Sequence, residues 1–481
     1  MKITKIFLKN FQAFYGEHEI DLGRNGKNLL IYGENGSGKS SLLKAIELFL
    51  DSHVRNLNFN RYRNFFAADA DGGHVKISAR ANANEPETTF EWSNAIRTTD
   101  DPIILDAAKT KGVLDYKALL EVYFLHPKDC EVNIFNLLVN TILANSRNEF
   151  TQRRLIEDWE AIQQMPIPRQ NHNNKIQDYQ AALDNFNQGL QAILNQLRQE
   201  LGNILQKFEY PISLEFDFQG VTLNIPEKRL DNQSVLLKIN FYDQHFPLVH
   251  QFLNEAKLSA IALSIYLASL KINPSSELKI LVLDDVLIVL DMSNRLPVID
   301  ILKEEFGDYQ TFLMTYDKEW YDILKRNFQN WKAIELYAGR EEDYEIPVLL
   351  DNKPYLEKAK FYLEKHDHKA AAIYLRTAFE VKIKWFCEKK NIPVKYREKP
   401  KDLTSNDFWE PIKNARTQNG DLKYIDATLA SQVELYRSLV MNPLSHARLV
   451  NVPRQEIEDA INTIERLETV LDQFVYGRQQ P

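Results

Sequence analysis

Near the N-terminus apolar and polar residues alternate, whereas later segments are continuously apolar. The alternation across residues 3–8 predicts a half-buried strand and not a signal peptide. Residues 280–283 show no polar alternation, which predicts a strand buried within a parallel sheet. An apolar strand over residues 29–32 leads through a glycine-rich loop into an apolar helix over residues 42–50. These patterns predict an α/β fold for this part of the chain.

Residues 148–208 carry a helical periodicity with one interruption. Apolar residues recur there at three- and four-residue spacing: Ile176, Tyr179, Leu183, Phe186, Leu190, Ile193 and Leu197. This spacing predicts a helix with a single apolar seam. Pro166 and Pro168 interrupt the segment, so we expect two helices joined near them. An arm of this size would be at most ~45 Å long at ~1.5 Å per residue, which is too short for chromosome-scale bridging.

The composition becomes helical after residue 345, which predicts a separate all-α module. Four helices are expected, over residues 356–366, 368–390, 431–440 and 457–474, with a looser connection over 391–409. Helices of this number and spacing favour a small bundle. The expected domains are an N-terminal lobe (1–147), a helical hairpin insert (148–208), a C-terminal lobe (209–345) and the helical domain (346–481).

The composition is that of a cytoplasmic protein with several domains. The chain has 481 residues, of which 44% are hydrophobic and 26% charged, and these numbers indicate folded, soluble domains. No apolar run reaches the ~18 residues that a membrane span needs. The two cysteines, Cys130 and Cys387, form no CxxC pair, which argues for a reducing compartment and against a zinc site. A net charge of −8 is not that of a protein that coats DNA, although a local basic face is still compatible with it.

The loop after the strand over residues 29–32 matches the motif G-x-x-x-x-G-K-[ST], which cradles phosphates. Its candidate nucleotide-binding residues are Gly33, Asn35, Gly36, Gly38, Lys39, Ser40 and Ser41. The glycines let the backbone approach an anion, and the N–H groups that lead into the helix form an anion-binding nest. Lys39 is expected to reach the outer phosphates and Ser40 to ligate Mg²⁺. The motif therefore predicts ATP and Mg²⁺ as cofactors.

Two sequence stretches resemble the heads of SMC-like and RecF-like ABC ATPases. They are K-I-x-x-I-x-L-K-N-F-x-A-F near the N-terminus and N-L-L-I-Y-G-E-N-G-S-G-K-S-S at the P-loop. The resemblance implies an ABC head with an antiparallel β-subdomain over residues 53–135, and it places Asn10 to Phe14 near the adenine and ribose. It also implies a Q-loop, for which no glutamine is evident. His126 occupies roughly that place, where a structural role is the alternative.

The later ABC motifs occur in the expected order, with departures. Residues 252–263 stand where the family has its signature L-S-G-G-Q/E, but Asn254 replaces Ser and Ala256 replaces the second Gly. The resemblance implies nucleotide-binding roles for Asn254, Glu255, Lys257 and the D-loop residue Asp291. The resemblance makes Asp284 the Mg²⁺-binding Walker B residue. An ordinary amphipathic helix is the alternative for residues 254–263.

Two departures predict a slow ATPase. Asp285 stands where most of these ATPases have the catalytic Glu, and it is one methylene shorter. Tyr316 replaces the His that senses the γ-phosphate, and a phenol cannot carry the charge of an imidazole. By resemblance the complete site is composite, with the P-loop of one subunit facing the signature loop of another. The implied assembly is a homo-oligomer, either a head-to-head dimer or a higher state.

The helical module resembles a HEPN-type domain. The resemblance rests on the segment A-A-A-I-Y-L-R-T-A-F-E (370–380) and on N-P-L-S-H-A (442–447). Bacterial anticodon nucleases join an ABC head to such a module and use an R-x-x-x-E helix with a distant His, which implies Arg376, Glu380 and His446 as catalytic residues. A His can move the proton of the 2′-OH, and an Arg can neutralise phosphorane charge. The alternative for Arg376 and Glu380 is a plain surface pair at i,i+4.

These features together predict a bacterial anti-phage protein. In this hypothesis an ABC ATPase oligomer responds to a phage-encoded trigger and controls a C-terminal ribonuclease that cuts RNA, with tRNA as the expected substrate. A second hypothesis makes the chain a sensor that docks a separate nuclease partner through a non-catalytic bundle. A third makes it a RecF-like ATPase that acts on DNA in repair, against which the short insert, the acidic charge and the additional bundle count. No membrane role is expected.

Overall fold

The computed structural model forms two compact units, Met1–Asp351 and Asn352–Pro481. It describes residues 1–97, 101–115, 133–242, 244–245, 253–273, 276–287, 290–341, 344–351, 355–395, 397, 403–442 and 453–477. The boundary expected after residue 345 falls inside strand β15 (Tyr344–Asp351), which pairs antiparallel with β14 (Lys332–Glu341). Because this ladder continues to Asp351, the first unit ends there. No helix of the described residues is long and apolar enough to cross a membrane.

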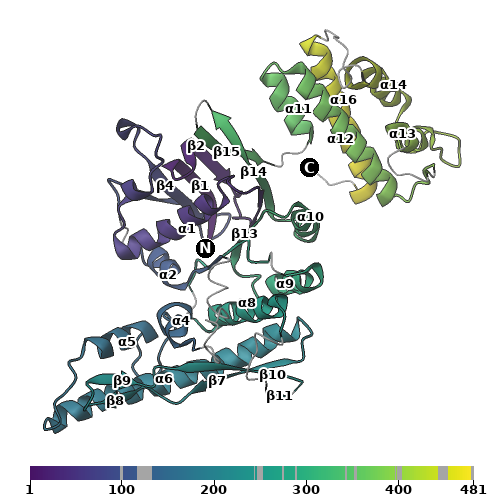
Figure 1. Cartoon of the computed structure of the whole chain (residues 1–481). Coiled ribbons are helices and arrows are strands. Elements are labelled where there is room, and N and C mark those ends of the chain that lie inside the picture. The colour runs from purple at the N-terminus through teal and green to yellow at the C-terminus, as the bar shows by residue number, and fades with distance from the viewer. Residues whose placement is uncertain are drawn as a thin grey trace. The chain divides into compact units, whose positions relative to one another are not determined.

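The centre of the first unit is a six-stranded sheet with the order β15-β14-β3-β13-β12-β6 (Figure 1). Besides β14, its inner strands are β3 (Leu29–Gly33), β13 (Gln310–Thr315) and β12 (Ile280–Asp284), and β6 (Gly112–Asp115) forms the edge opposite β15. Strands β14, β3, β13, β12 and β6 pair in parallel. The expected buried parallel strand over residues 280–283 is therefore β12, which lies between two parallel neighbours.

The sheet is buried on both faces, which explains its unbroken apolar runs. Leu29 and Ile31 point into one apolar core, together with α1 (Lys39–Arg55) and α2 (Pro102–Thr110). Leu30 joins the other core, formed with α8 (Glu255–Ile272), α9 (Met292–Glu304) and α10 (Lys318–Asn327). Strands β12 and β13 divide their residues between the two cores in the same alternating way.

An antiparallel sheet lies beside the first of these cores. Its order is β2-β1-β4-β5, formed by β2 (Phe14–Asp21), β1 (Lys2–Phe11), β4 (His74–Arg80) and β5 (Thr88–Ser93). Short 3₁₀ turns, η1 (Phe59–Tyr62) and η2 (Asp69–Asp71), connect α1 to β4. The alternating N-terminal pattern therefore forms β1, one face of which packs on the core that α1 shares.

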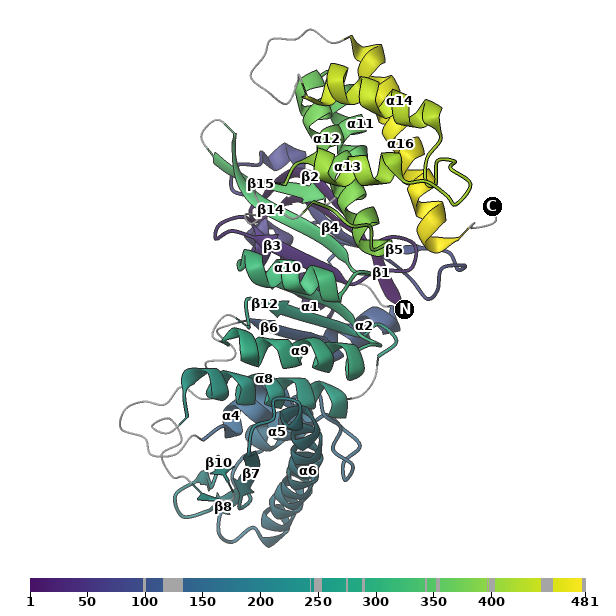
Figure 2. The same ribbon diagram turned by 90° about the vertical axis from the view of Figure 1, so that its right-hand side faces the viewer.

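The hairpin insert consists of α5 (Leu155–Gln164) and α6 (Asn173–Gln206), with the two prolines between them. Figure 2 shows α8 between the central sheet and the lobe that contains α6. Further elements of this lobe are α4 (Phe135–Leu137), the π-helical turn η3 (Leu138–Ile142), β7 (Ile212–Phe218), β8 (Thr222–Asn224), β9 (Arg229–Asp231), β10 (Val235–Phe241) and β11 (Gln244–His245). The apolar seam of α6 shares its core with α8, so the insert does not project as a free arm.

The described part of the second unit is helical and has its own apolar core. Its elements are α11 (Tyr355–Glu364), α12 (His368–Lys389), α13 (Ser405–Asn414), α14 (Ala427–Tyr436), the π-helical turn η5 (Arg437–Met441) and α16 (Arg454–Tyr476). Helix α13 corrects the expectation of a loose connection there. A capping box between Thr404 and Asp407 starts this helix, and Trp409 and Ile412 bury its apolar side.

Candidate nucleotide-binding site

The P-loop turns between β3 and α1 with a backbone that its glycines permit. Gly36 and Gly38 have φ values of +85° and +96°, in the region that glycine adopts without strain. A Cβ atom at Gly38 would lie 2.8 Å from Cγ of Pro347, so this position also lacks space for a side chain. Gly38 is the N-cap of α1 and provides no side-chain cap, which leaves the first N–H groups of the helix available to an anion.

Lys39 is the first residue of α1 and is folded back over the loop. Its Nζ donates to the carbonyl oxygens of Gly33, at 2.6 Å, and Glu34, at 3.2 Å. The side chain is only 5% exposed, and its Nζ lies 3.8 Å from Oδ2 of Asp285. The ammonium therefore lies between the loop and the end of β12, where a phosphate would be placed.

Ser40 and Asp284 meet where α1 begins and β12 ends. Ser40 Oγ donates to Asp284 Oδ2 at 3.1 Å. Burial raises the pKa of Asp284 to about 6, and the nearby carboxylates of Asp285 and Asp115 act in the same direction. The carboxylate thus lies in a position that a cation would stabilise.

Two buried oxygens at this site have no hydrogen-bond partner among the described residues. They are Asp284 Oδ1 and Ser37 Oγ. Buried polar atoms are rarely left unpaired in proteins, because the desolvation costs ~1–3 kcal/mol. Together with the Lys39 ammonium and the free helix N-terminus, these oxygens fit a nucleotide triphosphate with its Mg²⁺, which would supply their partners.

Asp285 is held in an unusual backbone conformation beside Asp284. Its φ is +54°, which Asp tolerates better than most residues. Its own N–H donates to the Met314 carbonyl at 3.1 Å, and its Oδ1 accepts the N–H of Tyr316 at 2.9 Å. Burial raises the pKa of Asp285, while Lys39 acts against this rise. The Tyr316 side chain is 43% exposed, so it is accessible from outside the head.

The expected signature residues form the N-terminus of α8. Asn254 is its N-cap, and the side chain accepts the N–H of Lys257 at 3.0 Å. Glu255 is exposed, and the Lys257 Nζ lies 4.9 Å from the ring centroid of Phe241. Similarly, Asp291 is the N-cap of α9 and accepts the N–H of Asn294. The predicted signature loop and the predicted D-loop therefore each end in the N-cap of a helix.

The RecF/RecN/SMC N-terminal domain family matches residues 2–333. The chain belongs to this family. The matched region contains β3, β6, β12 and β13 of the central sheet but ends just after β14 begins, and the first unit is an SMC-like ABC ATPase head. A search of the curated proteins finds no match to the sequence.

Solved structures similar to this SMC-family chain include three SMC heads. A head bound to the C-winged helix domain of ScpA is 16% identical, covers 74% of this chain and 100% of its own, and has a TM-score of 0.42. A Pyrococcus furiosus head with an extended coiled coil, bound to the C-terminal domain of ScpA, is 16% identical, with coverage of 76% and 99% and a TM-score of 0.44. The Thermotoga maritima head domain is 12% identical, with coverage of 73% and 100% and a TM-score of 0.35. Membership of the RecF/RecN/SMC N-terminal domain family rests on the sequence match over residues 2–333.

The other predicted site residues of this SMC-family chain lie as follows. Asn35 is exposed at the tip of the P-loop, and Ser41 is half-buried in the first turn of α1. In the second unit Arg376 Nε donates to Glu380 Oε1 at 2.9 Å on α12. His126 and His446 lie outside the described residues, so the structure does not place either beside its predicted partners.

Asn10 has a structural role in the head. It is 2% exposed, its Nδ2 donates to the Gly72 carbonyl at 2.9 Å, and its Oδ1 accepts the Gly16 N–H at 2.8 Å. These bonds explain how Asn10 can hold its positive φ of 49°. Phe14 is buried, and its ring edge would lie 3.7 Å from a Cβ at Gly38, so this residue supports the P-loop.

Arg295 is the last residue of the D-loop match over residues 290–295, but the motif assigned it no role. It lies four positions after Asp291 on α9 and is 9% exposed. Its Nε donates to the Leu290 carbonyl at 2.6 Å, and its guanidinium forms a 2.5 Å ion pair with Asp317. The arginine at the end of the D-loop match is visible in the sequence. Its partner Asp317 lies 22 residues further along the chain, at a spacing that no motif fixes.

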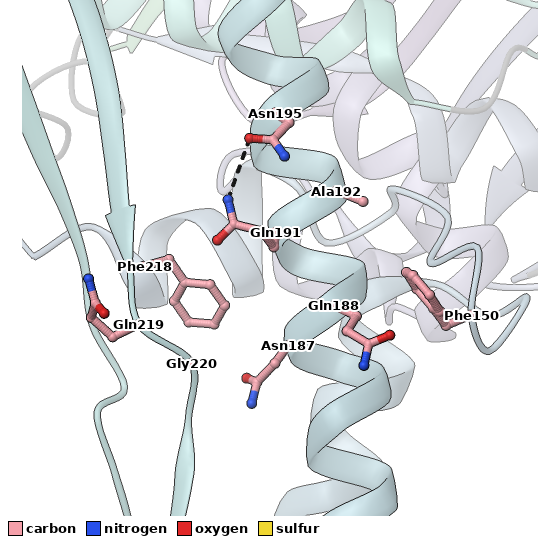
Figure 3. A pocket seen from close by; sticks show the side chains of 9 residues that line it. All are labelled: Phe150, Asn187, Gln188, Gln191, Ala192, Asn195, Phe218, Gln219 and Gly220. Atoms are coloured by element: carbon pink, nitrogen blue, oxygen red, sulfur yellow. Dashed lines mark hydrogen bonds between the residues drawn. The ribbon is translucent and has the colours of Figure 1, made fainter.

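A groove of about 450 Å³ occurs in the α6 lobe. Figure 3 shows the lining residues, most of which have amide or aromatic side chains: Phe150, Asn187, Gln188, Gln191, Ala192, Asn195, Phe218, Gln219 and Gly220. None of these residues is charged, and none belongs to the P-loop or to β12. The groove therefore lacks the cationic chemistry that a nucleotide triphosphate requires.

Proposed function

We propose that this chain is an ATP-dependent molecular switch that binds Mg-ATP in its head and hydrolyses it slowly. The observation that carries this proposal is the convergence of Lys39, Ser40, Asp284 and Asp285 at the ends of adjacent elements, where two buried oxygens have no partner among the described residues. Charged groups preorganised in a buried site stabilise transferring phosphoryl groups more strongly than groups in water.

Each of these side chains has a specific part in hydrolysis. Lys39 would leave the carbonyls of Gly33 and Glu34 to bind the outer phosphates. Ser40 and Asp284 would hold Mg²⁺, which would neutralise charge on the phosphates. Asp285 would accept a proton from the attacking water, for which its raised pKa suits it. Because Asp285 also accepts the Tyr316 N–H, its reach is restricted, and this supports slow turnover.

We further propose that two heads complete the site. The N-cap Asn254 and the following N–H groups of α8 in one head would face the γ-phosphate bound by the P-loop of the other head. Asp291 would lie at the contact between heads. This assignment rests on the order of the family's motifs and on the capped start of α8, and it gives ATP control over the oligomeric state.

ATPase measurements on the full chain test the nucleotide proposal. We expect Lys39→Ala to abolish hydrolysis and to weaken ATP binding by ~100-fold or more, because a buried charge-assisted contact is lost. Lys44→Ala is a matched control, since Lys44 lies on the same helix and is exposed. If Lys39→Ala retains wild-type hydrolysis, the site is not the one that turns over ATP and the proposal fails.

For the helical unit, we propose an RNA-cleaving role within anti-phage defence, controlled by the head. The specific observation in its favour is the ion pair of Arg376 with Glu380. In this proposal a phage signal changes the ATP-bound assembly, and His446 acts with the pair on tRNA. The pair is also compatible with a plain surface contact, so two alternatives are retained: a bundle that docks a separate nuclease, and a RecF-like ATPase acting in DNA repair.

Cleavage assays with purified tRNA separate these alternatives. The ribonuclease proposal expects cleavage by wild-type chain and its loss in His446→Ala and Glu380→Gln, with ATPase activity retained. Glu388→Gln, an exposed residue on the same helix, is the control. Intact tRNA under every nucleotide condition overturns the proposal in favour of the docking alternative. DNA-stimulated ATPase activity without toxicity on overexpression favours the repair alternative.

A further inference from the structure

Arg295 joins two functional loops of the head. Its Nε donates to the carbonyl of Leu290, the residue before Asp291, at 2.6 Å. From the same guanidinium, Nη1 donates to Asp317 Oδ2 at 2.5 Å. The planar guanidinium presents its donors in a fixed geometry, so it holds the Leu290 carbonyl and the Asp317 carboxylate at a set separation. The Trp320 ring lies 5.8 Å from the Arg295 Cζ and covers the contact.

Asp317 in turn follows Tyr316, whose backbone contacts the proposed catalytic carboxylate. It is the N-cap of α10, and its Oδ1 accepts the Trp320 N–H at 3.1 Å. The preceding residue, Tyr316, donates its backbone N–H to Asp285 Oδ1 at 2.9 Å. Although burial alone would raise the pKa of Asp317, its bond with Arg295 and those with the α10 backbone lower it. The carboxylate is therefore held in its charged form.

We propose that Arg295 is a positioning residue that makes the orientation of Asp285 depend on the position of the D-loop. The path runs from the Leu290 carbonyl through Arg295 and Asp317 to the Tyr316 N–H and Asp285. This inference rests on the proposed function, because it assumes that Asp285 activates water and that a second head contacts Asp291. Arg295 itself touches neither nucleotide nor water.

The consequence is a head that senses its partner before it hydrolyses ATP. When a second head contacts the D-loop, the Leu290 carbonyl is fixed, and the guanidinium transmits this constraint to the backbone of Tyr316. A displacement of roughly 1 Å of a catalytic group can change a rate ~100-fold. ATP binding depends mainly on the N–H groups of the P-loop and on the Lys39 ammonium, whose link to this path is the longer 3.8 Å contact with Asp285. Arg295 should therefore affect kcat much more than the affinity for ATP.

Three variants of the full chain test the path. Arg295→Met removes both hydrogen bonds and keeps an unbranched apolar stem against Trp320. Asp317→Asn removes the charge but keeps an oxygen to accept the Trp320 N–H, so α10 retains its cap. The third variant combines both. The matched control is Lys382→Met in the second unit. Lys382 Nζ forms a 2.7 Å ion pair with Asp472 and lies 4.4 Å from the Trp385 ring centroid, a similar pairing outside the head.

Steady-state kinetics and thermal unfolding are measured for each variant. We expect both single substitutions to lower kcat by ~10- to 100-fold, with KM and ATP affinity within ~2-fold of wild type. The double variant should be no slower than the slower single variant, because both changes break one path. Lys382→Met should lower the Tm about as much as Arg295→Met does, without changing kcat.

An unchanged kcat in Arg295→Met overturns the inference. The inference is also wrong if the loss of kcat in the double variant equals the product of the two single losses. It is wrong as well if ATP affinity falls by the same factor as kcat. Lys39→Ala in the same assay separates the positioning role of Arg295 from the proposed function of the head. If Lys39→Ala abolishes hydrolysis while Arg295→Met leaves it intact, only the positioning role is wrong. If wild-type hydrolysis does not depend on Lys39, the proposed function fails as well.

Discussion

The hydroxyl of Ser40 donates to Asp284 Oδ2 across 3.1 Å, joining residues that are 244 positions apart in the chain. Parallel pairing explains the meeting, because β3 and β12 both flank β13 and end at the same edge of the sheet. The helix that follows β3 therefore starts beside the end of β12. Among the described residues this hydroxyl donates to Oδ2 while Oδ1 of Asp284 has no partner, so the burial of the carboxylate is poorly compensated.

We expect the apo protein to be stabilised by Asp284→Asn at pH 7. The folded-state pKa is raised from 3.8 to about 6, so between these values the folded state binds more protons than the unfolded state. The free energy of unfolding then falls as the pH rises from about 4 to 6, by up to roughly 3 kcal/mol from this group. Asp284→Asn removes this pH-dependent loss of stability. Urea unfolding of the wild type and of Asp284→Asn at pH 4 to 8 measures the difference in the free energy of unfolding.

The exposed residue Asp300 on α9 provides the control for this experiment. Asp300→Asn should leave the pH dependence of unfolding as in wild type. Equal slopes for wild type and Asp284→Asn between pH 4 and 6 would contradict the prediction, since the buried carboxylate would then bind no additional proton in the folded state.

The sequence identified local features of the head well. A strand, a glycine loop and a helix are encoded by neighbouring residues, so the P-loop could be predicted from a motif whose physical requirements are local. The apolar run that became β12 was also readable, because burial on both faces removes polar alternation. The family match over residues 2–333 agrees with the resemblance to SMC-like and RecF-like heads.

Features that depend on contacts between distant elements were not predicted. The link of Arg295 to Asp317 has no sequence period, because it joins α9 to the start of α10. The unit boundary was placed too early because residues after 345 complete a strand whose partner is β14. Helix α13 begins at Ser405, inside the stretch 391–409 for which the sequence predicts only a loose connection. Tertiary packing decided each of these cases.

We expect Asp285→Asn to abolish hydrolysis while retaining ATP binding and the fold. Asn tolerates the +54° φ of this position as Asp does, and its amide oxygen can accept the Tyr316 N–H. The lost group is the proton acceptor, so kcat should fall ~100-fold or more. ATP should then hold the heads together for longer, and light scattering with size exclusion should show an oligomer that persists. Wild-type turnover in Asp285→Asn would exclude this residue as the base.

Asp285→Glu is the comparison variant for that experiment. A longer side chain would bring a carboxylate nearer to the water, but Glu fits the left-handed backbone less well, at a cost of ~1 kcal/mol. We therefore expect a lower Tm for Asp285→Glu than for Asp285→Asn. Thermal unfolding of the two variants without nucleotide checks the backbone argument separately from catalysis.

Gly38→Ala should disrupt the P-loop. The +96° φ is strained for alanine, and its Cβ would lie 2.8 Å from Cγ of Pro347 on β15. We expect a loss of stability of ~1–3 kcal/mol and a loss of ATP binding. Gly202→Ala is the matched control, because this glycine lies inside α6 with open space at its Cβ position. It should raise the stability by up to ~1 kcal/mol. Equal effects of the two substitutions would contradict the strain argument.

Complementation between two defective chains tests whether the site is shared between heads. Asn254→Asp keeps an N-cap oxygen for the Lys257 N–H, so α8 retains its start, but it directs a negative charge toward the proposed phosphate. Lys39→Ala and Asn254→Asp should each be inactive alone. In a mixture, about half of random dimers are heterodimers with one intact site of two, so ATPase activity should recover to about 25% of wild type. A site contained within one chain would give no recovery, because each protein then carries its own defect.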